Sequence, residues 1–162
     1  MVNLGTLKVG RINLNNLETI RELTNAIDRL IQIHSSYYTL SFKVQYYFVT
    51  PDGLLPTEKG WYILLDSKKP LYVGKAGDLN ARLNTNNGSI DNFANEKRAS
   101  DLERNFIKKF DELGIVDNLR VCIILEKNLC LELGLKQTDL TDLDRGNIEK
   151  IVDIFRTVFS YL

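Results

Sequence analysis

The chain has 162 residues, of which 44% are hydrophobic and 26% charged, the composition of an ordinary globular domain. Its 21 basic and 21 acidic residues cancel, so it lacks the strongly basic balance that tight non-specific nucleic-acid binding usually needs. No apolar run is long enough to cross a membrane, and we expect no secretory signal in the first residues. The length predicts one main domain with a full core.

Cysteine usage points to the compartment. The chain has two cysteines, Cys122 and Cys130, and Cys122 lies within an apolar run that predicts a strand. A small buried hydrophobic residue is the usual role of such a cysteine. We therefore expect no disulfide framework, and we predict a reducing, cytoplasmic location.

The N-terminal third predicts a helix. Asn15 or Asn16 is a suitable N-cap, and the following apolar residues recur at helical spacing until about His34. A short strand is predicted within residues 46–50, before a Pro-Asp-Gly turn. We assign residues 1–53 to an N-terminal helical extension and residues 54–162 to the main domain.

The main domain begins with a predicted hairpin. Residues 61–65 have the pattern of a buried strand, residues 66–70 that of a polar loop, and residues 71–73 that of the returning strand. Asp78 is a candidate N-cap for a helix that contains Arg82.

The rest of the chain predicts two helices and one strand. The Asn-rich residues 84–92 predict a loop, residues 94–113 a helix, and residues 120–125 a third strand. Residues 126–146 are acidic and ambiguous, and residues 147–161 predict a last helix.

Two tyrosines, a lysine and an arginine form the candidate site. Tyr62 and Tyr72 lie on adjacent predicted strands, Lys75 follows three residues later, and Arg82 lies about one turn into the next helix. Cleaving a phosphodiester needs an activated water and a cation on the phosphoryl oxygens, which an arginine can supply bidentately. A phenol is a poor base because it titrates near ~10, so a nearby cation must favour the phenolate. Lys75 is the candidate for that cation.

The segments Gly60-Trp61-Tyr62 and Tyr72 to Leu83 resemble the GIY-YIG nuclease family, and the resemblance extends over about residues 54–162. It implies an α/β fold of the α+β kind: a small three-stranded antiparallel sheet flanked by helices. It also implies a single-metal site in which Tyr62 and Tyr72 frame the attacking water and Arg82 contacts the scissile phosphate.

The resemblance further implies a metal-binding glutamate on a helix after the third strand. Glu149 fits best, with Glu103 and Glu132 behind it, and the ion would be Mg²⁺ or Mn²⁺. The family also places an asparagine about one helix length later, whereas the sequence ends at Leu162.

Each candidate also has a purely structural explanation. The tyrosines could be packed strand residues, Arg82 a solvated helix residue, and Glu149 an exposed one. His34, at a predicted helix end, has the position of a capping or surface residue.

The main functional hypothesis is a metal-dependent DNA endonuclease that hydrolyses phosphodiester bonds with a tyrosine-assisted water and one divalent ion. The alternative is a non-catalytic nucleic-acid-binding or assembly module that retains the fold, and metal binding would separate the two. A third hypothesis is a restriction-type enzyme with sequence-selective cutting. A homodimer is left open, because one active site needs two copies or two visits to break both strands.

Overall fold

The computed structural model of the chain describes residues 12–33, 36–43, 48–51, 55–66, 68–83 and 118–161. The loop predicted at 84–92 and the helix predicted at 94–113 lie outside the described residues, as do His34 and Glu103.

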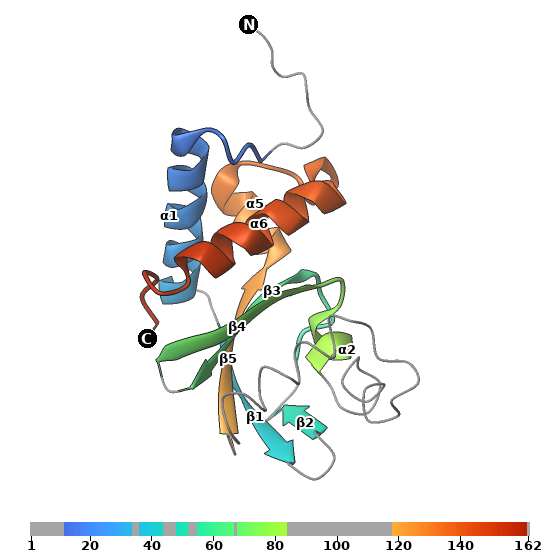
Figure 1. The fold of residues 1–162 in the computed structure, drawn as a ribbon. Coiled ribbons are helices and arrows are strands. Elements are labelled where there is room, and N and C mark those ends of the chain that lie inside the picture. The colour runs from blue at the N-terminus through green and yellow to red at the C-terminus, as the bar shows by residue number, and fades with distance from the viewer. Residues whose placement is uncertain are drawn as a thin grey trace, which may run out of the picture.

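The described part is an antiparallel sheet of five strands packed against helices (Figure 1). The strand order is β2-β1-β5-β3-β4. The elements are α1 (Leu17–Ile33), β1 (Ser36–Lys43), β2 (Phe48–Pro51), β3 (Gly60–Asp66), β4 (Lys69–Ala76), α2 (Leu79–Leu83), β5 (Asn118–Leu125), α5 (Glu126–Leu133), the 3₁₀ turn η2 (Gln137–Asp139) and α6 (Asp142–Phe155). The expected three-stranded antiparallel sheet is confirmed as β4, β3 and β5, and β1 and β2 extend it.

The N-terminal region supplies both a helix and strands. The predicted helix is confirmed as α1, and Asn16 caps it by accepting hydrogen bonds from the backbone N–H groups of Glu18 and Thr19, at 2.9 and 3.3 Å. The strand β1 was not predicted, and it pairs with β5 in the register Tyr37↔Cys122. The described residues of this N-terminal region thus share one sheet and one core with the rest, while the division at residue 53 stays a prediction.

The β3–β4 hairpin separates its side chains onto two faces. Trp61, Ile63 and Leu65 belong to the core beneath the helices, whereas Tyr62 and Leu64 alternate with them and are equally buried. A Cβ built on Gly60 would lie 3.2 Å from Leu79 of α2, so the even-numbered residues of β3 face α2. The hairpin therefore has a core face and a second, α2 face.

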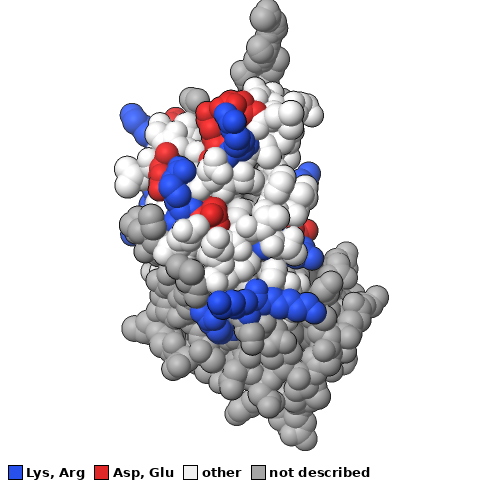
Figure 2. Space-filling view, turned by 90° about the vertical axis from the view of Figure 1, so that its left-hand side faces the viewer, with Lys and Arg blue, Asp and Glu red and all other residues white. Residues whose placement is uncertain are grey.

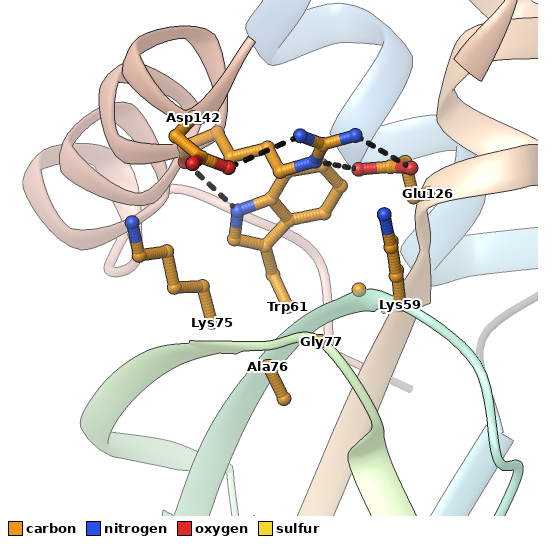
Figure 3. A pocket seen from close by; sticks show the side chains of 9 residues that line it. Lys59, Trp61, Lys75, Ala76, Gly77, Glu126 and Asp142 are labelled. Carbon is orange, nitrogen blue, oxygen red and sulfur yellow. Dashed lines mark hydrogen bonds and ion pairs between the residues drawn. The ribbon is translucent and has the colours of Figure 1, made fainter. Parts of the chain in front are cut away.

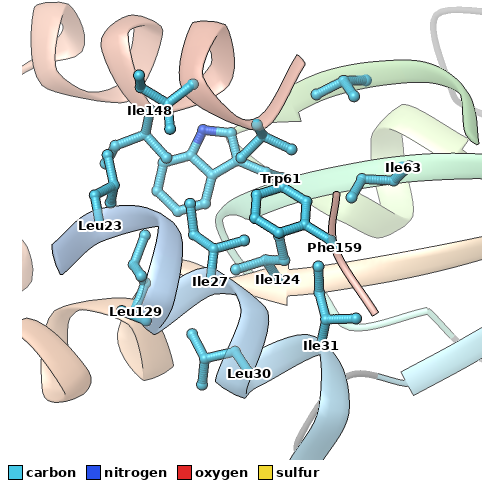
Figure 4. Close-up of a cluster of buried hydrophobic side chains, with 14 of the residues drawn as sticks. Leu23, Ile27, Leu30, Ile31, Trp61, Ile63, Ile124, Leu129, Ile148 and Phe159 are labelled. Carbon is cyan, nitrogen blue, oxygen red and sulfur yellow. The ribbon is translucent and has the colours of Figure 1, made fainter. Parts of the chain in front are cut away.

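The core lies between the sheet and the helices α1, α5 and α6, which lie on one side of it in Figure 1. In Figure 4, Trp61 and Ile124 from the sheet meet Ile27 from α1 and Ile148 from α6. Burying this much apolar surface is the main force that holds the layers together. None of the described helices is long and apolar enough to cross a membrane.

The C-terminal helices differ in their limits from the prediction. The ambiguous region contains α5, and α6 begins at Asp142 rather than 147 and ends at Phe155 rather than 161. The early start has a local cause, because Thr141 and Asp144 form a capping box. The carboxylate of Asp144 is fully buried and also accepts a hydrogen bond from the backbone N–H of Ile12 at 2.9 Å.

Candidate functional site

Two tyrosines stack on the α2 face of the hairpin. Leu64 pairs with Tyr72 and Tyr62 pairs with Gly74, so Tyr62 and Tyr72 lie on the same face of adjacent strands. Their ring centroids are 6.2 Å apart, with an interplanar angle of 28°. Tyr62 is 1% exposed, whereas Tyr72 is partly open to solvent. The sequence prediction that these two tyrosines lie on adjacent strands is confirmed.

Two glycines make room for this arrangement. A Cβ on Gly74 would lie 2.3 Å from Cζ and 2.4 Å from the hydroxyl oxygen of Tyr62. A Cβ on Gly60 would lie 2.3 Å from the carbonyl oxygen of Ile124 on β5. Such distances leave no space for a side chain, so both positions require glycine for packing.

Arg82 reaches the tyrosines from α2. Its Nε–H donates a hydrogen bond to the phenol oxygen of Tyr62, at 3.4 Å. The short helix is held in place by Asp78, which caps it by accepting from the backbone N–H of Ala81 at 3.0 Å, as predicted. The Arg82 guanidinium lowers the pKa of both phenols and so opposes part of the effect of burial.

Glu149 approaches the same site from α6. Its carboxyl group is half-buried, and this burial raises its pKa, while the Lys75 ammonium, the Lys75 backbone N–H and the Arg82 guanidinium act to lower it. The Glu149 charge in turn raises the pKa of Tyr62 and Tyr72. Glu149, Arg82 and the two phenols are therefore close enough to perturb one another.

Both tyrosines keep their protons at neutral pH. Burial is the largest cause, and it raises the pKa of each phenol above its ordinary value of 10. A neutral phenol can orient a water molecule by hydrogen bonding but cannot readily remove its proton. The role of Tyr62 or Tyr72 as the base stays a prediction.

Lys75 lies on the other face of β4. It pairs with Trp61, and its Nζ lies 3.8 Å from the position of a Cβ built on Gly146 in α6. Residues three apart in a strand point to opposite faces, so Lys75 cannot share a face with Tyr72. Its charge acts on Glu149 and is not among the causes that perturb either phenol. The structure thus brings Tyr62, Tyr72, Arg82 and Glu149 together, with Lys75 behind Glu149.

The other acidic residues considered as metal ligands differ in where they lie. Glu132 on α5 forms an ion pair with Arg29 of α1 at 3.4 Å, and Glu103 lies outside the described residues. Asp153, not singled out from the sequence, lies one turn after Glu149 and raises the pKa of both Glu149 and Tyr72. Its i, i+4 spacing from Glu149 was the signal that could have revealed it. It also forms an ion pair with Arg156.

The oxygen atoms near Glu149 suit a hard cation that takes few of its ligands from the protein. Within the described ranges, no group of three or more His, Cys, Asp or Glu side chains could enclose a metal ion. Mg²⁺ commonly uses one or two carboxylates and completes its shell with water and phosphate oxygens. A single half-buried glutamate beside two phenols is compatible with that mode and not with a closed structural metal site.

Basic side chains also gather on one side of the molecule. Figure 2 shows a band of Lys and Arg on the side of the molecule that lies at the left of Figure 1. The exposed Lys68, in the β3–β4 turn, and Lys69, the first residue of β4, lie at this end of the hairpin. A chain with no net charge can therefore still present a locally positive surface.

Comparisons of the chain with models of known protein families, with curated proteins and with solved structures gave no match.

Proposed function

We propose that this protein is a metal-dependent DNA endonuclease of the GIY-YIG type. The observation that carries the proposal is the convergence of four groups from four elements: the Tyr62 and Tyr72 phenols of β3 and β4, the Arg82 guanidinium of α2 and the Glu149 carboxylate of α6. The order of these residues in the chain also follows the motif resemblance.

Each group has a defined task in this proposal. Arg82 binds the non-bridging oxygens of the scissile phosphate and stabilises the charge that builds up there. The phenols of Tyr62 and Tyr72 hold the attacking water by hydrogen bonds. Glu149, once ionised, holds the divalent ion, and a bound ion of this kind acidifies water and polarises phosphoryl oxygens. Lys75 favours the ionised form of Glu149.

The test is cleavage of supercoiled plasmid in Mg²⁺ or Mn²⁺, with EDTA as the metal-free control. We expect nicking by the full chain, and its loss in Arg82→Ala and Glu149→Gln. The matched controls are Arg21→Ala, which removes an exposed arginine paired with Glu18, and Glu132→Gln on α5. Full activity in Arg82→Ala or Glu149→Gln would refute the assignment.

A non-catalytic nucleic-acid-binding module is the second candidate. One observation favours it: packing against Tyr62 alone explains the glycine at position 74, so this part of the motif needs no catalytic role. A protein that binds DNA but neither cuts it nor gains thermal stability from Mg²⁺ would establish this alternative.

A further inference from the structure

A cavity of about 300 Å³ opens on the core face of the hairpin, where β3 begins and β4 ends against α6 (Figure 3). Its charged and aromatic lining residues are Lys59, Trp61, Lys75, Glu126, Asp142 and Arg145. Because it lies on the face opposite Tyr62 and Tyr72, it is distinct from the candidate catalytic site.

The two carboxylates of the cavity are already engaged. Arg145 contacts Glu126 at 2.5 Å and Asp142 at 3.3 Å. Glu126 is 1% exposed, and Gln137 donates a further hydrogen bond to it at 3.4 Å. The backbone of this arginine is fixed as well, because the Trp61 indole N–H donates to the Arg145 carbonyl oxygen at 3.1 Å. Two carboxylates and one guanidinium leave this wall with a single net negative charge, and only the Glu126–Arg145 pair in it is largely buried.

Two ammonium groups face this wall. Lys59 and Lys75 rise from the sheet on either side of Trp61 in Figure 3, and both are exposed to solvent. Within the described part of the chain, neither lysine forms an ion pair. Lys59, Lys75 and Arg145 outnumber Glu126 and Asp142, so the charge of the cavity lining is +1, and an anion bound here would meet the two ammonium groups.

The surroundings indicate the size and kind of anion. A second cavity of about 500 Å³ shares Lys59, Gly77, Glu126 and Arg145 with the first, so the two form one groove with room beyond a single phosphate. Lys75 also acts electrostatically on Glu149, which links this groove to the site across the β4 edge.

We propose that the groove binds, through Lys59 and Lys75, a backbone phosphate of the DNA strand that the protein cuts, and so provides a second phosphate-binding site. The choice of a DNA strand as the ligand rests on the proposed endonuclease function. The shared chemistry, a nucleotide phosphate held by two lysines, would also suit a free mononucleotide.

Trp61 gives a direct readout, because it is the only tryptophan in the chain and lines the cavity. The full chain is titrated in EDTA, without cleavage, while tryptophan emission is followed. The probes are thymidine, thymidine 5′-monophosphate and a short thymidine oligonucleotide. We expect a saturable change with the monophosphate and none with thymidine.

Matched variants locate the binding. Lys59→Ala should weaken monophosphate binding about tenfold, because a charged contact is lost. Lys59→Arg should retain binding. Lys68→Ala removes the same charge from an exposed lysine in the β3–β4 turn that lines neither cavity, and it should change the affinity less than about twofold. Equal losses in Lys59→Ala and Lys68→Ala, or identical responses to thymidine and its monophosphate, would overturn the proposal.

The oligonucleotide shows whether the ligand is a DNA strand or a free mononucleotide. If the oligonucleotide binds more tightly than the monophosphate, with the same dependence on Lys59, the result supports a DNA strand. If the two bind equally, a DNA strand is overturned as the ligand. Absence of plasmid cleavage together with Lys59-dependent phosphate binding would refute the endonuclease and not the groove. Cleavage without any Lys59 effect would refute the groove alone.

Discussion

The phenol of Tyr62 lies directly over Gly74, so closely that a single methyl group at position 74 would overlap Cζ and the hydroxyl oxygen of the ring. The ring is 1% exposed, and it is held between the stacked Tyr72 and the Arg82 guanidinium. The position of the candidate site's central phenol thus depends on one missing side chain on the neighbouring strand.

We expect Gly74→Ala to destabilise the protein by about 1–3 kcal/mol, because the ring or the strand must move to relieve the overlap. Gly77→Ala is the control, since a Cβ there meets nothing within 4 Å. Urea unfolding measures both variants. Combining Gly74→Ala with Tyr62→Leu should cost less than the sum of the two single changes, and strict additivity would contradict the overlap.

Glu149→Gln should stabilise the metal-free protein at neutral pH. The pKa of Glu149 is raised in the folded state above its ordinary 4.5, so the contribution of this group is fully present below pH 4.5 and is lost as the pH rises through the folded pKa. Glutamine avoids that loss, and the gain should stay below about 1 kcal/mol because the carboxyl group is only partly removed from water.

The measurement for Glu149→Gln is the melting temperature in EDTA at several pH values. The difference from the unmodified protein should shrink below pH 4.5, and Mg²⁺ should stabilise only the protein with Glu149. A variant that is less stable than the unmodified protein at neutral pH would contradict the assigned direction.

Arg82→Lys should fail to replace the arginine in cleavage. Lysine keeps the charge but loses the planar group that binds a phosphate with two parallel hydrogen bonds, and we expect the nicking rate to fall about 10²-fold. Arg29→Lys, which conserves an exposed ion pair with Glu132, is the matched control. Nicking by Arg82→Lys at the unmodified rate would show that only charge matters at this position.

Glu126→Ala should be strongly destabilising. It leaves the Arg145 guanidinium without its buried partner, and such losses cost about 3–5 kcal/mol. Lys127→Ala breaks an exposed pair with Glu58 and should cost under about 1 kcal/mol. Chemical denaturation measures the free energy of unfolding of the two variants. Similar losses in Glu126→Ala and Lys127→Ala would contradict this prediction.

Asp144→Ala and Asp142→Ala form a matched pair at the start of α6. Asp144 accepts hydrogen bonds from the backbone of Ile12 and of Thr141, and its removal leaves two donors unsatisfied, so we expect a cost above about 2 kcal/mol. The Asp142 side chain is 99% exposed, and its removal should cost about 0.5 kcal/mol or less. Comparable unfolding curves for the two variants would contradict the anchoring role of Asp144.

Local patterns predicted several elements correctly. The N-caps Asn16 and Asp78 and the apolar run around Trp61 identified α1, α2 and β3, because each signal is complete within a few residues. The start of α6 was missed although its capping box, Thr141 with Asp144, is also local and visible in the sequence.

Other features depend on distant parts of the chain. The strand β1 is completed by pairing with β5, some eighty residues later, and no local pattern announces that partner. The buried pair of Glu126 and Arg145 is likewise formed by tertiary packing. The placement of Lys75 beside Tyr72, by contrast, could have been corrected from the sequence, since the two-residue period of a strand separates them.

The central position of β5 has a consequence for how the protein is made. Both β1 and β3 pair with β5, whose residues 118–125 are synthesised only after about three quarters of the chain has been made. Until then the β1–β2 and β3–β4 pairs have no strand to join them, and each exposes an unpaired edge. A nascent or truncated chain that stops before β5 is therefore expected to be prone to aggregation, and the sheet should assemble late, in one step, once β5 is available.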